Sequence, residues 1–146
     1  MELIDSIGDG PVALDSAMFI YLIEQHPKYL PLLKPVFERI DRGELAAVTS
    51  SLSLMETLIV PYRNGDLELA RKYEDILTTG RGLTLVPIDL PVVRLAAEIR
   101  ATTSARTPDA LQLAAALIAG CSAFLTNDHR FPPFHAVRIL RLDAFV

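Results

Sequence analysis

Hydrophobic residues along the chain occur in two patterns, short continuous runs and longer stretches with helical spacing. The continuous runs are bounded by turn residues and acids, which is typical of strands buried on both faces of a parallel sheet. They predict five strands, at 12–15, 46–50, 83–88, 123–126 and 136–142. Apolar residues spaced three or four apart predict helices between them, at 19–23, 30–41, 53–64, 66–79, 91–100 and 110–119. Strands that alternate with helices predict an α/β fold with three layers (α/β/α) around a central, mainly parallel sheet of about five strands.

Two of the predicted helices have clear start signals. Ser53 with Glu56 three residues later has the form of a capping box, which predicts a helix that begins at Ser53. Thr107, Pro108 and Asp109 predict another start, with the threonine as N-cap, the proline at the first helical position and the acid in the first turn. Both signals place an acid near the beginning of a helix.

Length and composition favour a single domain over residues 1–146. Of the 146 residues, 51% are hydrophobic, which is far too many for a disordered chain. The single cysteine, Cys121, cannot form an internal disulfide, and the three histidines lack the spacing of zinc ligands. No uninterrupted apolar stretch reaches the ~18 residues of a membrane span, and the acidic N-terminal segment is unlike a secretory signal. We therefore expect a cytoplasmic protein without membrane association.

Charge is distributed unevenly. The formal net charge is −4, of which residues 1–89 carry −6 and residues 90–146 carry +2, with arginine but no lysine after Lys72. An acidic protein is poorly suited to nonspecific coating of nucleic acid, which requires a basic face. The mean hydropathy of +0.32 is high for a small domain and predicts apolar surface that a partner covers.

Four acids lie at or near the ends of predicted strands. Asp15 ends the first strand, Glu56 lies one helical turn beyond the second, Asp128 follows the fourth, and Asp109 opens the helix before it. Each could by itself be a helix cap or a turn residue. If the fold brings them to one edge of the sheet, where parallel sheets bind ligands, their mutual repulsion favours a bound cation. Oxygen ligands without cysteine or a well-placed histidine select Mg²⁺ or Mn²⁺ over zinc.

Four segments that contain these acids resemble, in order and with suitable spacing, the motifs of PIN-domain ribonucleases. The segments are residues 13–21 (ALDSAMFIY), 50–56 (SSLSLME), 107–117 (TPDALQLAAAL) and 124–128 (FLTND), the last followed by Phe131. A compact chain of this kind most resembles the VapC-type toxins of prokaryotic VapBC toxin–antitoxin pairs.

The resemblance implies a metal-dependent endoribonuclease in which Mg²⁺ (or Mn²⁺) activates a water for attack on phosphorus. Ser16 and Asn127 would lie beside the acids and orient water or a carboxylate. Two positions depart from the family's pattern, because Ala17 stands where asparagine or serine is common and Gln112 stands where histidine is common. By motif match, the catalytic and metal-binding acids would be Asp15, Glu56, Asp109 and Asp128.

The expected partners are an RNA substrate, a cognate antitoxin protein and a second copy of the chain. Arg106 and Arg130 lie nearest the acid motifs, so we expect them to bind RNA phosphates, each of which arginine can hold with two hydrogen bonds. Apolar stripes at 18–23 and 52–62 predict a homodimer and a groove for an apolar antitoxin segment. The alternative for both stripes is that they face the sheet.

Other functions are compatible with acids at strand ends. A receiver domain or a haloacid-dehalogenase-like phosphatase would use a lysine late in the chain, and none follows Lys72. The phosphatase would also need an acid at the position of Ala17. A catalytically inactive PIN module would serve as an RNA-binding or scaffold protein, and an assay for metal-dependent cleavage separates it from the enzyme.

Overall fold

The structure, a computed structural model that describes residues 2–146, contains one sheet of five parallel strands. The strand order is β3-β2-β1-β4-β5, and each neighbouring pair is parallel. The predicted fold class is therefore confirmed. The strands are β1 (Val12–Leu14), β2 (Ala47–Ser50), β3 (Leu83–Val86), β4 (Ala123–Thr126) and β5 (Arg138–Arg141).

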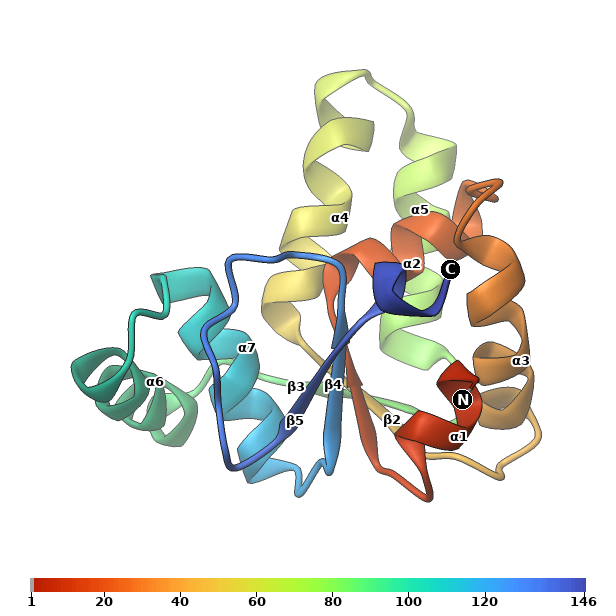
Figure 1. The fold of residues 1–146 in the computed structure, drawn as a ribbon. Helices are drawn as coiled ribbons and strands as arrows, with labels where there is room; N and C mark the ends of the chain where they lie inside the picture. The colour runs from red at the N-terminus through yellow and green to blue at the C-terminus, as the bar shows by residue number, and fades with distance from the viewer. Residues whose placement is uncertain (1) are drawn as a thin grey trace.

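Helices cover both faces of this sheet, as Figure 1 shows. One apolar core lies between the sheet and α1, α2, α3 and α5, and a second lies between the opposite face and α6 and α7. Successive strand residues serve the two cores in turn: Leu14 and Leu125 face the first, and Ala13 and Phe124 face the second. The helices are α1 (Leu3–Ile7), α2 (Ser16–Ile23), α3 (Leu30–Asp41), α4 (Ser51–Arg63), α5 (Leu67–Thr79), α6 (Leu90–Thr102), α7 (Thr107–Ile118) and the 3₁₀ helix η1 (Leu142–Phe145).

Both predicted helix starts are wrong in detail. β2 runs directly into α4, so the extended residue Ser50 is the N-cap, and Ser53 lies inside the helix. The hydroxyl of Ser53 bonds to the side chains of Thr49 and Gln112 in place of closing a capping box. Arg106, not Thr107, is the N-cap of α7. At Ser53, a tertiary hydrogen bond to Gln112 has replaced the local one that the sequence pattern favours.

The strand order creates one switch point in the connections. From β1 the chain passes to β2 and β3 on one side and then crosses to β4 on the other side of β1. In parallel sheets a crevice opens at the carboxyl ends of the two strands where the direction of winding reverses. The residues that follow β1 and β4 therefore border such a crevice.

None of the helices in the described part of the chain combines the length and the apolar character that crossing a bilayer requires.

Candidate functional site

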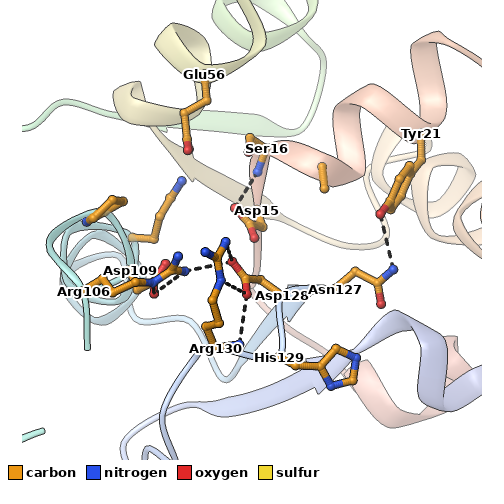
Figure 2. A pocket seen from close by; sticks show the side chains of 13 residues that line it. Asp15, Ser16, Tyr21, Glu56, Arg106, Asp109, Asn127, Asp128, His129 and Arg130 are labelled. Carbon is orange, nitrogen blue, oxygen red and sulfur yellow. Dashed lines mark hydrogen bonds and ion pairs between the residues drawn. The ribbon is translucent and has the colours of Figure 1, made fainter. Parts of the chain in front are cut away.

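A pocket of about 550 Å³ opens at the carboxyl ends of β1 and β4. Residues from four separate parts of the sequence line it, and Figure 2 shows how their side chains converge. The structure thus brings together every residue for which the sequence predicts a role in the site. These are the acids Asp15, Glu56, Asp109 and Asp128, the neighbours Ser16 and Asn127, and the arginines Arg106 and Arg130.

Asp15 joins the end of β1 to the start of α2, where it is the N-cap. Its Oδ1 accepts a hydrogen bond from the backbone N–H of Ser16 (2.8 Å), and its Oδ2 accepts one from the hydroxyl of Thr126 (2.7 Å). Burial is the main cause that raises the pKa of Asp15, and the charges of Asp109 and Asp128 raise it further. A capping role and a site role are compatible, because one oxygen serves the helix and the other faces β4.

Glu56 enters the pocket from α4, and its side chain points toward Asp15 in Figure 2. The side chain is half-buried, and its burial together with the charge of Asp15 raises its pKa. The position follows from α4 starting directly at the end of β2, so that its first turns overhang the edge of the sheet at which β1 ends.

Arg106 bridges the other two acids. Its Nε and Nη2 lie 2.7 and 2.6 Å from Oδ2 of Asp109, and the same Nη2 lies 2.8 Å from Oδ2 of Asp128. The side chain of Asp109 is only 6% exposed, and burial raises its pKa although the adjacent guanidinium opposes this shift. One guanidinium therefore links the first turn of α7 to the loop after β4.

Arg130 pairs with Asp128 alone. Its Nε and Nη2 donate to the two carboxylate oxygens at 3.0 and 2.9 Å, and its backbone N–H donates at 2.9 Å. These bonds, with those from Arg106, hold the pKa of Asp128 well below its usual range. Both arginines that the sequence predicts to bind RNA are thus paired with acids of the pocket.

Asn127 positions the loop that carries Asp128. Its side-chain amide donates to the hydroxyl of Tyr21 (3.3 Å) and accepts from the backbone N–H of Asp143 in η1 (3.1 Å). The backbone N–H of Asp128 donates to Thr126 (3.0 Å). Contacts to α2, β4 and η1 therefore fix the direction in which Asp128 faces.

Two further side chains support the site, and the sequence analysis did not assign this role to either of them. The hydroxyl of Thr126 donates to the carboxylate of Asp15 and accepts from the backbone N–H of Asp128. Its position at the end of a strand, one residue before Asn127, is the sequence signal that could have indicated this role. Gln112 is buried in the pocket wall, where its Oε1 accepts from Ser50 (2.9 Å) and its Nε2 donates to Ser53 (2.8 Å). It lies three residues after Asp109 and therefore on the same helix face.

The pocket contains four acids, but their carboxylates do not surround a single point. Within residues 2–146, no three His, Cys, Asp or Glu side chains are grouped closely enough to hold one metal ion. The guanidinium of Arg106 lies between two of the four acids, and Asp15 and Glu56 face the pocket from its other side. The pocket thus offers carboxylate oxygens for a cation and guanidinium groups for an anion.

The chain is similar in fold to several solved structures, one of which is a toxin–antitoxin complex. The chain is similar to VapBC2 from Rickettsia felis bound to promoter DNA (TM-score 0.67, 15% identity, 89% of this chain and 97% of that chain). It is also similar to DNA-bound VapBC from Salmonella typhimurium (TM-score 0.62, 19% identity, 90% of this chain and 97% of that chain). A third similar structure is a toxin–antitoxin complex from Klebsiella pneumoniae (TM-score 0.57, 13% identity, 82% of this chain and 88% of that chain). No curated protein sequence matches the chain.

The family model of the PIN domain matches residues 12–136. This span runs from β1 to the loop before β5 and contains all four segments from which the pocket acids come. The chain belongs to the PIN-domain family.

Proposed function

We propose that the protein is a Mg²⁺- or Mn²⁺-dependent endoribonuclease, the toxin component of a type II toxin–antitoxin system, and that residues 1–146 form one PIN domain. The observation that carries the proposal is the convergence of Asp15, Glu56, Asp109 and Asp128 on one pocket. Family membership and the toxin–antitoxin complexes among the similar folds support a PIN nuclease of this type.

The residues of the pocket fit a hard divalent cation. All candidate ligands are carboxylate oxygens, which Mg²⁺ and Mn²⁺ prefer. No Lys, Arg or His of residues 2–146 forms an ion pair with Asp15, whose pKa is raised by burial and by two neighbouring acids. A bound cation would relieve that cost. We assign the metal-binding role to Asp15, Glu56, Asp109 and Asp128.

The cation, when bound, would lower the pKa of a coordinated water and offset the charge that develops on phosphate oxygens. The chain itself positions the acids that would bind the cation. Thr126 and the N–H of Ser16 fix the Asp15 carboxylate, and Asn127 fixes the loop of Asp128, so the positions of these two acids are set before a cation binds. Arg106 and Arg130 stand in the same pocket and would hold the RNA phosphate, since a guanidinium contacts two oxygens at once.

The direct test is cleavage of RNA by the purified protein. We expect cleavage with Mg²⁺ or Mn²⁺, none after chelation with EDTA, and recovery when the metal is restored. Among residues 2–146, the one histidine that lines the pocket is His129, which is exposed and pairs with Asp143. Cleavage that survives exhaustive chelation would contradict the metal requirement. RNA binding without cleavage in any metal would favour the inactive PIN module.

The proposed partners are an antitoxin and a second copy of the chain. Of the two apolar stripes in the sequence, the one in α2 contributes Met18 and Phe19 to the core. The one in α4 leaves a solvent-facing apolar surface on a helix that projects beyond the sheet in Figure 1. Its exposed residues are Met55, Ile59, Val60 and Tyr62, each at least 43% exposed. A surface of this kind favours burial against another protein.

We assign the homodimer interface to this α4 surface and expect an Ile59→Asp variant to be monomeric. A carboxylate at the centre of an apolar interface would be desolvated without a partner. Light scattering at high protein concentration measures the outcome. Ile118→Asp, at the end of α7 and similarly exposed, is the matched control and should leave the dimer intact. A wild-type protein that stays monomeric at high concentration would contradict the dimer.

A further inference from the structure

Arg106 occupies an unusual place for an arginine of a carboxylate pocket. It is the N-cap residue of α7, and its side chain is only about one-third exposed (36%). Its Nη2 contacts Oδ2 of Asp109 at 2.6 Å and Oδ2 of Asp128 at 2.8 Å. A single positive group thus contacts two acids, one three residues and the other 22 residues away from it in sequence.

We propose that Arg106 is a resident counter-ion that competes with the divalent cation, so that metal binding requires its guanidinium to leave Asp109 and Asp128. The inference rests on the proposed function, because it assumes that these acids bind the metal. It goes beyond that function by giving Arg106 a second role, which is to set the affinity of the site for its cation.

The physical basis is that the two positive groups need the same oxygens. Oδ2 of Asp109 accepts a hydrogen bond from Nε of Arg106 and lies 2.6 Å from Nη2 of the same guanidinium, so little space and lone-pair density remain there for a cation. The guanidinium charge also repels a divalent ion at short distance. In the arginine-held arrangement no three acidic side chains within the described residues are close enough to share an ion. Departure of Arg106 leaves Asp109 free to turn toward Asp15, whereas Asp128 keeps its bonds to the exposed Arg130.

Arg130 cannot play the same part. It contacts Asp128 but not Asp109, and its side chain is 71% exposed. Its removal therefore frees one acid that still keeps Arg106 as a partner. Figure 2 shows the difference: Arg106 reaches across from α7, whereas Arg130 approaches Asp128 from the following loop. A comparison of Arg106 and Arg130 variants therefore separates the loss of a nearby positive charge from the loss of the contact that links Asp109 to Asp128.

A displaced guanidinium remains in the pocket, where a phosphate can take the place of the two carboxylates. Metal loading would thereby release the group that binds substrate. Removal of Arg106 should accordingly have opposite effects on two binding steps, with tighter binding of the metal and weaker binding of RNA.

The test measures Mn²⁺ binding to the full chain by calorimetry, without RNA. We expect Arg106→Gln to bind Mn²⁺ about tenfold more tightly than the wild type, within the usual range of coupling between two sites. Arg130→Gln should gain clearly less. Arg71→Gln, an exposed position on α5 with the same change of charge, should match the wild type. Arg106→Lys keeps the charge but loses the fork, so its affinity should lie between those of the wild type and the glutamine variant.

Melting temperatures provide an independent readout. In EDTA, Arg106→Gln should melt below the wild type, because Asp109 and Asp128 lose their shared counter-ion. Saturating Mn²⁺ should raise its melting temperature by more than it raises that of the wild type. If Arg106→Gln does not fold, the comparison of Arg106→Lys with the wild type decides in the same way.

Two results would overturn the inference. If Mn²⁺ binds the Arg106 variants no more tightly than it binds the wild type or Arg130→Gln, the metal site stands but Arg106 does not compete for it. If Mn²⁺ binds neither the wild type nor the Arg106 variants, the proposed metal-dependent function fails, and the inference fails with it.

Discussion

Replacement of Asp15 with asparagine is expected to abolish RNA cleavage and to raise the melting temperature of the metal-free protein. If Asp15 is a direct metal ligand, as we propose, its loss should reduce cleavage by more than the 10- to 100-fold that is typical for a residue that only supports a ligand. The stability gain arises because burial and neighbouring acids disfavour the charged form of Asp15, as its raised pKa indicates. Asparagine removes the charge and can still accept from Ser16, while its amide group can donate to Thr126.

The gain in melting temperature should depend on pH in a defined direction. The folded protein holds the Asp15 proton more tightly than the unfolded chain does, so the wild type is penalised at neutral pH. As the pH falls through the raised pKa, the folded wild type takes up the proton and the penalty shrinks, and it disappears below the ordinary pKa of the unfolded chain. The difference between wild type and Asp15→Asn, about 1–2 kcal/mol at neutral pH by the Coulomb energies of such neighbours, should therefore shrink in acid.

Asp109→Asn should raise the melting temperature of the metal-free protein by less than Asp15→Asn does. By sequence alone the two positions are equivalent, because both are acids of the predicted cluster whose members repel one another. In the structure Asp109 is the buried partner of Arg106, and removal of one member of such a pair leaves the other charge less well compensated. Because burial raises the pKa of Asp109 in spite of this pair, the lost ion pair reduces the gain in stability without reversing it. We therefore expect Asp109→Asn to lose cleavage as Asp15→Asn does but to melt closer to the wild type in EDTA.

Asp66→Asn is the matched control for both variants. Asp66 caps α5 with an exposed hydrogen bond to Leu69, and asparagine caps helices about as well as aspartate. Its melting temperature should stay close to that of the wild type, with or without Mg²⁺. If Asp15→Asn behaves like Asp66→Asn in thermal melts, Asp15 is only a helix cap, and the site assignment fails at that residue.

Simultaneous replacement of Arg106 and Arg130 by alanine should weaken RNA binding and reduce its dependence on salt. Each phosphate contact that is lost should lower the slope of log affinity against log salt by about 0.7–0.9, so the double variant should lose roughly 1.4–1.8. The measurement is RNA binding at several salt concentrations with Mg²⁺ present, in the Asp15→Asn background so that the RNA stays intact.

The matched control for this pair is Arg39→Ala with Arg42→Ala. These arginines also pair with an acid, Glu44, but they lie at the end of α3 and outside the pocket. The control carries the same net change in charge and should leave affinity and salt slope nearly unchanged. Equal losses in both double variants would mean that RNA responds to overall charge, and the placement of RNA at the pocket would be wrong.

Much of this architecture was determined by the sequence alone. Continuous apolar runs predict the five strands because a strand buried on both faces must be apolar at successive positions. α3 and β4 have the predicted bounds. Acids placed directly after strands reach the same edge because parallel strands end on the same side, which is why Asp15 and Asp128 meet in one pocket.

Short elements and helix starts were less accessible to the sequence. α1 spans five residues and η1 spans four, too few for a helical period to be recognised. The start of α4 was misplaced because the pattern of Ser53 and Glu56 describes only local hydrogen bonds. In the folded protein the hydroxyl of Ser53 is hydrogen-bonded to the side chains of Thr49 and Gln112. A local signal loses when a buried partner from elsewhere in the chain offers the same hydrogen bond.

The sequence by itself determined which chemical groups would stand at the edge of the sheet, because strand periodicity and strand direction are local properties of the chain. Only the tertiary structure decided how those groups are paired. Arg106 meets Asp128 across 22 residues, and Gln112 meets Ser50 across 62. Such pairings depend on the orientation of whole elements, which is set by the packing of two cores on one sheet and leaves no periodic trace in the sequence.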